Sequence, residues 1–206
     1  MFFKEKNVKK GAVLITGSSS GIGAACVKML NEQGFWVFAG LRDMAKAEPL
    51  LSQASNQQSI TPILLDVTKL DLIDEAVRQV NETLTTEETS FIGIVNNHTS
   101  EHHGPLEILP LEIIQQEMEV DYFGTLNVVK AFLPLLRKHQ GRIVTFSSVN
   151  GRCVFRSIGA SCAAKYPMVG YVRCLVFRAS TLEYSRCKRW TWGGGYPTVG
   201  QSARSL

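Results

Sequence analysis

Three glycines near the amino end are the first residues in this sequence whose spacing points to chemistry. They follow an apolar run at residues 13–15 and precede a helical pattern that starts near residue 24. Glycine lets the backbone approach a ligand closely, and a helix N-terminus presents unpaired N–H groups that attract phosphate. The segment therefore predicts a pyrophosphate site, although three glycines also suit a plain turn. The candidate cofactor-binding residues are Gly17, Ser18, Ser19, Ser20, Gly21, Ile22 and Gly23.

Charged residues after the next two apolar runs indicate the kind of nucleotide. Arg42 follows the second run, and a guanidinium suits the 2′-phosphate of NADP(H). Asp43 is an alternative, because NAD sites place an acid about 20 positions beyond the glycine turn; an exposed loop arginine is another. Asp66 and Val67 follow the third run, where an acid either faces the ligand crevice or caps a turn. We expect NADP(H) to be preferred over NAD(H).

The elements that must position these residues alternate along the chain. Strands are predicted at residues 12–16, 35–39, 60–65, 91–95 and 142–146, and helices near residues 22–33, 45–54, 72–84 and 111–138. Alternation of this kind indicates a parallel sheet that helices cover on both faces. The predicted fold class is α/β, a doubly wound parallel sheet in a three-layer αβα domain.

Helix ends can also be predicted from single residues. Gly34 and Gly141 stand where helix C-termini are expected, and Asp71 is a candidate N-cap. Pro134 lies late in the fourth predicted helix and should kink that helix or mark its last turns.

Length and composition favour a single soluble domain. The chain has 206 residues, of which 45% are hydrophobic, enough for a sizeable core. Its five cysteines show no metal-binding spacing, which favours reduced thiols. The first eleven residues lack the long apolar stretch of a signal peptide, so we expect a cytoplasmic location.

The net charge of +4 is unevenly distributed. Residues 150–206 contain nine Lys or Arg and one acid, whereas residues 1–149 contain 13 basic and 17 acidic residues. A basic end interspersed with aromatic residues could contact nucleic acid or an anionic membrane. A solvated tail is the interpretation we favour, so neither partner is expected.

Further motifs occur in the order and spacing of a known family. They are Thr16, Gly17, Gly21 and Gly23 (a TGxxxGxG motif), Asn96-Asn97 after the fourth predicted strand, Ser148 and Lys165. Over roughly residues 10–180 the sequence resembles the short-chain dehydrogenase/reductase family, closest to its hydroxysteroid, retinol and carbonyl reductase branches. The resemblance implies a Rossmann-type fold. It also implies an NADP(H)-dependent oxidoreductase acting on an alcohol or carbonyl, such as a steroid, retinoid or other lipophilic substrate.

The resemblance implies roles for individual positions as well. The family position of Arg42 selects NADP(H), that of Asp66 and Val67 contacts adenine, and Asn96 belongs to a cofactor-binding motif. Family catalysis uses a tyrosine that exchanges a proton with the substrate oxygen and a lysine that lowers the tyrosine pKa and binds the nicotinamide ribose. A serine steadies the substrate oxygen, and an asparagine holds a water. The catalytic positions here, in chain order, are Asp121, Ser148, Ser161 and Lys165.

Two catalytic positions depart from the family pattern. Ser161 replaces the tyrosine of Y-x-x-x-K, and a serine hydroxyl is a weaker acid that is too short to reach the same oxygen. Tyr166 does not compensate, because on a helix it points about 140° away from residue 161. Asp121 replaces the asparagine and could pair with Lys165. Impaired activity is therefore expected, and a non-catalytic relative that binds cofactor or a partner is the alternative.

The loop after the fourth predicted strand departs too. Residues 96–99 read NNHT where the family has NNAG, so the small Ala-Gly pair beside the cofactor is lost. His98, His102 and His103 could hold a metal ion, but we expect solvated histidines and no metal.

The carboxyl end carries the last family position. Thr198 matches the threonine of PG-x3-T, which in the family contacts the nicotinamide carboxamide. Eight residues follow it, so we expect the last strand and the substrate-lid helix to be lacking and the pocket to be open to water. The expected domains are a Rossmann-type domain at residues 1–185 and a divergent basic, aromatic segment at residues 186–206. A homodimer packed through the helices of Asp121 and Lys165 is also expected.

Overall fold

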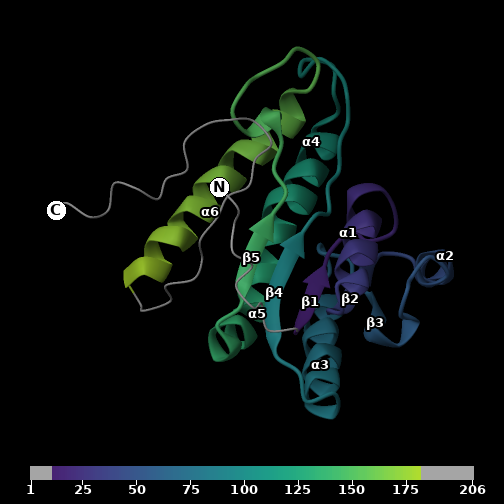
Figure 1. The fold of residues 1–206 in the computed structure, drawn as a ribbon. Helices are drawn as coiled ribbons and strands as arrows, with labels where there is room; N and C mark the ends of the chain where they lie inside the picture. The colour runs from purple at the N-terminus through teal and green to yellow at the C-terminus, as the bar shows by residue number, and fades with distance from the viewer. Residues whose placement is uncertain (1–10, 182–206) are drawn as a thin grey trace, which may run out of the picture.

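The described part of the chain is built on one parallel β-sheet (Figure 1). It comprises residues 11–181 of a computed structural model, without the side chains of residues 173 and 175–181. The five strands of this part lie in the order β3-β2-β1-β4-β5, and all neighbours are parallel. They are β1 (Ala12–Ile15), β2 (Trp36–Leu41), β3 (Ile60–Leu64), β4 (Phe91–Asn96) and β5 (Arg142–Thr145). Each predicted strand is confirmed to within two residues.

The central strand β1 is where the order of the sheet reverses. From β1 the chain adds β2 and β3 on one side, then returns to add β4 and β5 on the other. Ile15 at the end of β1 lies opposite Ala39 of β2 and Val95 of β4. The segments that follow these strands therefore meet at one edge, at the position where open α/β sheets bind ligands.

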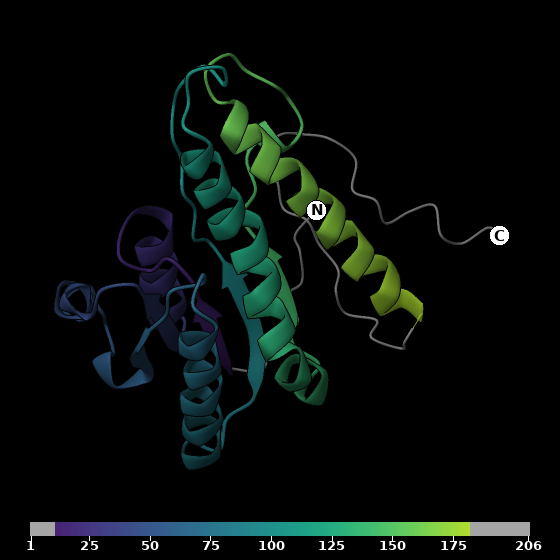
Figure 2. The ribbon, with the colours of Figure 1, turned by 180° about the vertical axis from the view of Figure 1, so that it is seen from behind.

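Helices cover both faces of the sheet, because successive strand residues point to opposite sides. The longer ones are α1 (Gly21–Glu32), α2 (Ala47–Leu51), α3 (Leu70–Thr86), α4 (Leu111–Glu117), α5 (Thr125–His139) and α6 (Gly159–Thr181). Leu14 of β1 belongs to a core cluster with Ile73 of α3 and Phe132 of α5. Ile15 belongs to a second cluster with Val27 of α1. The predicted three-layer, doubly wound architecture is confirmed, and Figure 2 shows α3, α5 and α6 in front of the sheet.

The helix predicted over residues 111–138 is a continuous rod in three parts. Between α4 and α5 lies the π-helical segment η3 (Met118–Gly124). Helix α6 packs against this segment and against α4 and the 3₁₀ turn η4 (Val149–Gly151). Two further 3₁₀ turns, η1 (Met44–Lys46) and η2 (Gln57–Ser59), connect elements at the β2–β3 end of the sheet.

Three of the helix-end predictions concern helix C-termini. Gly34 follows α1 with φ +82°, the left-handed conformation predicted there. At the end of α5, Gln140 takes that conformation (φ +53°) rather than Gly141. Glycine is needed at position 141 for a different reason, because a Cβ there would lie 2.9 Å from the Phe91 carbonyl oxygen. Pro134 lies within the last turns of α5.

The N-cap prediction for Asp71 is wrong. Helix α3 begins at Leu70, and Asp71 lies inside its first turn. The turn before the helix is instead closed by Asp66, whose Oδ1 accepts hydrogen bonds from the N–H (2.9 Å) and hydroxyl (2.7 Å) of Thr68. An Asx turn at Asp66 therefore precedes the helix, and the predicted cap Asp71 lies beyond the helix start.

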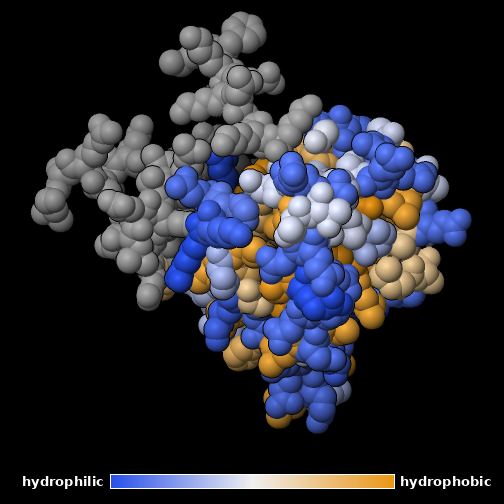
Figure 3. Space-filling view, turned by 90° about the horizontal axis from the view of Figure 1, so that it is seen from below, coloured by the Kyte–Doolittle hydropathy of each residue, from blue (hydrophilic) through white to orange (hydrophobic). Residues whose placement is uncertain are grey.

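The surface mixes polar and apolar residues. Figure 3 shows both kinds side by side on the face seen from below. Within residues 11–181 no helix combines the length and the apolar character that crossing a bilayer demands. Thr198, the segment 186–206 and the parts predicted to be lacking all lie outside the described residues.

Candidate active site

A cavity of about 290 Å³ lies where β1, β2, β3 and β4 end. The cavity lies at the reversal of strand order, as the fold class predicts. Each of the four strands contributes the segment that follows it, and η3 adds one residue. The lining residues are Gly17, Ser19, Ser20, Ile22, Arg42, Leu65, Asp66, Val67, Asn97, His98, Thr99 and Val120.

The glycine turn shapes one wall of this cavity. Gly17 and Gly21 have φ of +65° and +56°, a conformation that other residues rarely adopt. Gly23 lies so close to the carbonyl oxygen of Gly17 that a Cβ would collide with it. Ser20, the N-cap of α1, makes no side-chain cap hydrogen bond. The amides of the first turn of α1 are therefore not capped by this side chain, which suits an incoming phosphate.

Ser18 differs from the rest of the predicted phosphate-binding segment. It is fully buried, its hydroxyl donates to the carbonyl oxygen of Ile15 (2.7 Å) and its N–H donates to that of Gly40 (3.0 Å). Ser18 thus ties the turn to β1 and β2, whereas Ser19, Ser20 and Ile22 line the cavity.

The charged residues predicted to read the nucleotide lie at the far side of the cavity. Arg42 is exposed and lines it, whereas the Asp43 carboxylate accepts a hydrogen bond from the N–H of Ala45 (2.9 Å) and caps η1. Asp66 lines the cavity and also closes the turn with Thr68. Both roles considered for it from the sequence, facing the crevice and capping a turn, are therefore present. Burial alone would raise the pKa of Asp66, but the Thr68 hydrogen bonds and the charges of Arg42 and Lys69 lower it overall.

The two asparagines at the end of β4, Asn96 and Asn97, make different contacts. Asn96, the one predicted to bind cofactor, is buried, and its amide donates to the Thr145 hydroxyl in β5 (3.2 Å). Asn97 lines the cavity, and its amide donates to the carbonyl oxygen of Gly17 (3.0 Å). Neighbouring residues of a strand point to opposite sides, so only one of the pair can face the cavity. The structure makes that residue Asn97.

His98 is held at both ring nitrogens. Its Nδ1 lies 2.6 Å from the Thr16 hydroxyl, and its Nε2 lies 3.2 Å from the Thr125 hydroxyl. Because the Thr125 hydroxyl donates to the carbonyl oxygen of Asp121 (2.7 Å), it accepts from Nε2–H. Burial and the nearby charge of Lys165 lower the pKa of His98 to about 3, so the ring is neutral at pH 7. The prediction of a solvated histidine is wrong here.

The other two histidines of the loop, His102 and His103, lie beside glutamates. The N–H and ring of His102 contact the carboxylate of Glu117, with Nδ1 at 3.1 Å, while His103 lies 3.9 Å from Glu101. Burial raises the pKa of Glu117, although the His102 contacts act in the opposite direction.

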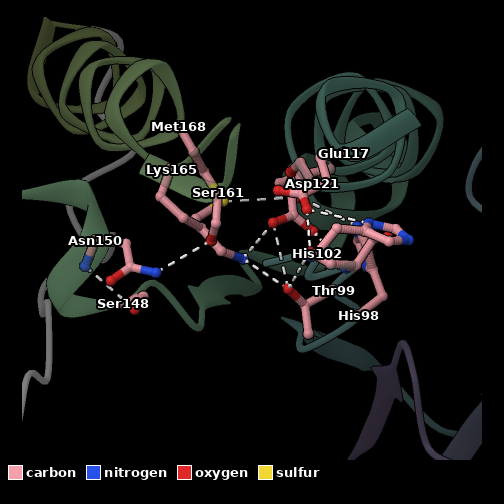
Figure 4. Close-up of polar contacts among 12 residues, drawn as sticks. His98, Thr99, His102, Glu117, Asp121, Ser148, Asn150, Ser161, Lys165 and Met168 are labelled. Carbon is pink, nitrogen blue, oxygen red and sulfur yellow. Dashed lines mark hydrogen bonds and ion pairs between the residues drawn. The ribbon is translucent and has the colours of Figure 1, made fainter. Parts of the chain in front are cut away.

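An ion pair connects the two predicted catalytic helices. Lys165 Nζ of α6 lies 2.9 Å from Asp121 Oδ2 of η3, and the two side chains are 7% and 0% exposed. Thr99 joins the pair: its hydroxyl donates to Asp121 Oδ2 (3.2 Å) and accepts from Lys165 Nζ (3.2 Å). The N–H of Ser100 donates to Asp121 Oδ1 (2.9 Å). The predicted pairing of Asp121 with Lys165 is confirmed (Figure 4).

The two candidate catalytic serines share one neighbour. The Ser148 hydroxyl accepts from the N–H of Asn150 (3.2 Å) and caps η4. The Ser161 hydroxyl accepts from the Asn150 side-chain amide (3.1 Å), and both residues are buried. Figure 4 shows this group on one side of Lys165 and the Asp121–Thr99 group on the other. Within residues 11–181, the cavity lining includes neither serine nor Lys165.

Comparison with known proteins decides the family. Residues 11–182 match the family model for short chain dehydrogenases. The chain belongs to this family. This short-chain dehydrogenase is 33% identical over 173 residues to the mitochondrial D-beta-hydroxybutyrate dehydrogenase of Bos taurus. It is 39% identical over 162 residues to the estradiol 17-beta-dehydrogenase 2 of Mus musculus. These matches cover 83% and 77% of the chain but 50% and 41% of the relatives, so the chain spans about half their length.

A solved structure agrees with this assignment. A short chain dehydrogenase from Burkholderia cenocepacia in complex with NADP is 25% identical, with a TM-score of 0.70. The match covers 84% of this chain and 68% of that one. An alcohol dehydrogenase from Thermococcus sibiricus, complexed with 5-hydroxy-NADP, shares the fold with a TM-score of 0.76 at 24% identity and covers 82% of this chain and 72% of that one.

Neither Tyr166 nor Tyr171 of this short-chain dehydrogenase is placed like a replacement for the tyrosine missing at position 161. Tyr166 is 43% exposed. Burial and the nearby Tyr122 raise the pKa of Tyr171 to about 12. That shift is opposite to what a proton donor working near neutral pH requires.

Sequence reasoning missed cavity residues that carry no charge or motif signal of their own. Leu65 and Val120 line the cavity as apolar walls, and Thr99 lies beside Lys165. For Asn97 and Thr99 a usable signal existed, because both lie in the segment that departs from the family's NNAG motif.

Proposed function

We propose that this chain binds NADP(H) in the cavity and is an oxidoreductase of reduced activity toward an alcohol or carbonyl. The observation that carries the cofactor assignment is the combination of the glycine turn with Arg42 on a single cavity. A turn with glycines at its tightest positions accommodates a pyrophosphate, and a guanidinium at the other end suits a 2′-phosphate. The relative from Burkholderia cenocepacia that was solved with NADP supports this assignment.

NADP(H), when bound, supplies or accepts the hydride, and the chain must supply the proton. The family proton donor is a tyrosine, and here Ser161 accepts a hydrogen bond from Asn150 at the corresponding position. An aliphatic hydroxyl is a poor general acid near neutral pH. Lys165, which in the family acts on that tyrosine and on the nicotinamide ribose, is engaged by Asp121 and Thr99. The contacts of Ser161 and of Lys165 therefore both support the proposal that proton transfer is slow.

A lipophilic substrate agrees with the apolar side chains on the loops beside Lys165. Leu106 and Ile108 lie in the loop between β4 and α4 and are 51% and 74% exposed. Val154 and Phe155 lie in the loop between η4 and α6 and are 73% and 45% exposed. The two loops meet in a bridge between Gly104 and Ile158. Estradiol 17-beta-dehydrogenase 2 and retinol dehydrogenase 16, two relatives of the chain, are named for lipophilic substrates.

A second candidate function is cofactor binding without turnover. The specific observation in its favour is the buried Asp121–Lys165 pair, which engages two of the polar positions that the family uses around the nicotinamide. Such a protein would respond to NADP(H) through its stability or its partners rather than through chemistry.

A thermal-shift titration with NADPH and with NADH tests the shared part of both functions. A ligand that binds only the folded state adds about 2.7 kcal/mol of stability at 100 times its Kd, which is enough to shift Tm visibly. NADPH should raise Tm more than NADH does. A folded sample that responds to neither cofactor would refute the proposal, and a turnover assay with retinol or estradiol then separates the two candidates.

A further inference from the structure

We infer that His98 and Thr99 narrow the nucleotide cavity on the side of Lys165, so that the site prefers an adenosine nucleotide carrying a 2′-phosphate and binds the nicotinamide half of NADP(H) only weakly. The inference rests on the proposed nucleotide site. It concerns which half of the cofactor that site holds more tightly, and it assigns the weak binding of the nicotinamide half to two side chains.

The extent of the cavity is the first observation. Its volume of about 290 Å³ is at the lower end of the range for ligand pockets, about 300–1,000 Å³. Its lining runs from Arg42 and Asp66 past the glycine turn to His98, Thr99 and Val120. Lys165 is not part of the described lining, although it lies only 3.2 Å from the Thr99 hydroxyl. The exposed Thr99 therefore lies between the described lining and the Lys165 ammonium.

Thr99 is fixed in this position by its hydroxyl. It donates to Asp121 Oδ2 and accepts from Lys165 Nζ, each over 3.2 Å. Threonine is branched at Cβ, so a hydroxyl held in this way also fixes the direction of the methyl group. Moving the side chain aside would break its hydrogen bonds to both members of a buried ion pair.

His98 is fixed more firmly still. Both ring nitrogens are bonded, one to the Thr16 hydroxyl and the other to that of Thr125. The backbone of His98 is fixed as well, because its Cα would lie 2.8 Å from a Cβ on Gly17. The imidazole and the glycine turn are therefore packed as one unit, and a ligand cannot displace the ring without disturbing the turn that holds its phosphates.

Isothermal titration calorimetry of the full chain tests the inference with two probes, 2′,5′-ADP and NADPH. The wild-type chain should bind both with similar Kd, because the nicotinamide half adds little net binding. In the double variant His98→Ala/Thr99→Gly, NADPH should bind about tenfold more tightly or better, while 2′,5′-ADP should keep its Kd. His103→Ala, a change in the same loop at a side chain 68% exposed, is the matched control and should alter neither Kd.

The outcomes separate the inference from the proposed function. Wild-type binding of NADPH about tenfold tighter than 2′,5′-ADP overturns the inference and keeps the function. A folded double variant with unchanged Kd for both probes also overturns the inference alone. Absence of binding by both probes to a folded wild-type chain overturns both.

A measurement on the wild-type chain guards against a double variant that fails to fold. Saturation-transfer NMR with NADPH should show transfer from the protein to the adenine protons and little to the nicotinamide protons. Equal transfer to the two rings would overturn the inference.

Discussion

The Lys165 ammonium lies 2.9 Å from the Asp121 carboxylate in a site that solvent barely reaches. A buried pair of this kind contributes little net stability, but breaking it leaves a charge without a partner. The pair therefore makes η3 and α6 dependent on each other, and its removal can be measured directly.

Asp121→Ala should lower the free energy of unfolding by about 3–5 kcal/mol, because Lys165 is left buried without its counter-charge. Asp121→Asn should cost much less, since the amide oxygen still accepts a hydrogen bond from the ammonium. Urea unfolding of each variant measures the difference. The double variant Asp121→Ala/Lys165→Met should recover much of the loss; equal losses in the Asn and Ala variants would contradict this account.

Restoring the missing phenol together with the family amide should raise turnover. Ser161→Tyr/Asp121→Asn is expected to accelerate carbonyl reduction with NADPH by about tenfold or more, because a positioned general acid contributes about 10²–10⁴-fold. Initial rates measured by NADPH absorbance check this. The control Ser161→Phe/Asp121→Asn has the ring without the hydroxyl. Equal rates for the Tyr and Phe variants would show that the hydroxyl plays no part.

Arg42→Ala should weaken NADPH binding by about tenfold and leave NADH binding nearly unchanged. Hydrogen bonds to charged groups are worth about 1.5–3 kcal/mol, and an exposed guanidinium lies at the lower end of that range. Calorimetric Kd values for the two cofactors provide the test. Asp43→Asn is the matched control, because the Asp43 carboxylate caps η1 and does not belong to the described cavity lining. Equal weakening of both cofactors in Arg42→Ala would assign the residue a structural role.

The neutral His98 predicts a pH dependence of stability. Its folded pKa of about 3 is below the ordinary value of 6.5, so its contribution is present above pH 6.5 and is lost as the pH falls toward 3. Each pH unit in that window costs up to about 1.4 kcal/mol. His98→Gln keeps hydrogen-bonding groups without titrating and should flatten the profile between these values.

The difference between wild type and His98→Gln isolates this effect from other titrating groups. Because the pKa of Asp66 is lowered, its contribution to stability is also lost as the pH falls, but at lower pH than that of His98. Glu117, with a raised pKa, acts in the opposite direction, since its contribution is lost as the pH rises. Parallel profiles for the two proteins in chemical denaturation would argue against a buried neutral His98.

The fold could be predicted because its determinants are local. The apolar runs specified all five strands, and Gly17 and Gly21 have the positive φ for which glycine is needed. The Asp121–Lys165 pair could be predicted as well, because a carboxylate and an ammonium at two converging family positions attract each other. These features depend on residue type and order alone.

The failures concern side-chain direction. Which of Asn96 and Asn97 faces the cavity depends on where β4 ends relative to β1, and the ring of His98 is held at Nε2 because Thr125 of α5 reaches it. Asp71 has the right type for an N-cap, but Asp66 formed an earlier turn. In the first two cases a tertiary contact selected between two locally acceptable arrangements, and in the third a hydrogen bond between residues two positions apart did so.

The π-helical segment η3 has a consequence for insertions and deletions. A π segment holds one more residue in its turn than a regular α-helix does, so removing one residue would rotate α4 by about 100° relative to α5. Glu117 on one side and Asp121 within the segment could then no longer face His102 and Lys165 at once. Both contacts depend on helical phase, so a single-codon deletion in η3 should be more damaging than most point substitutions there.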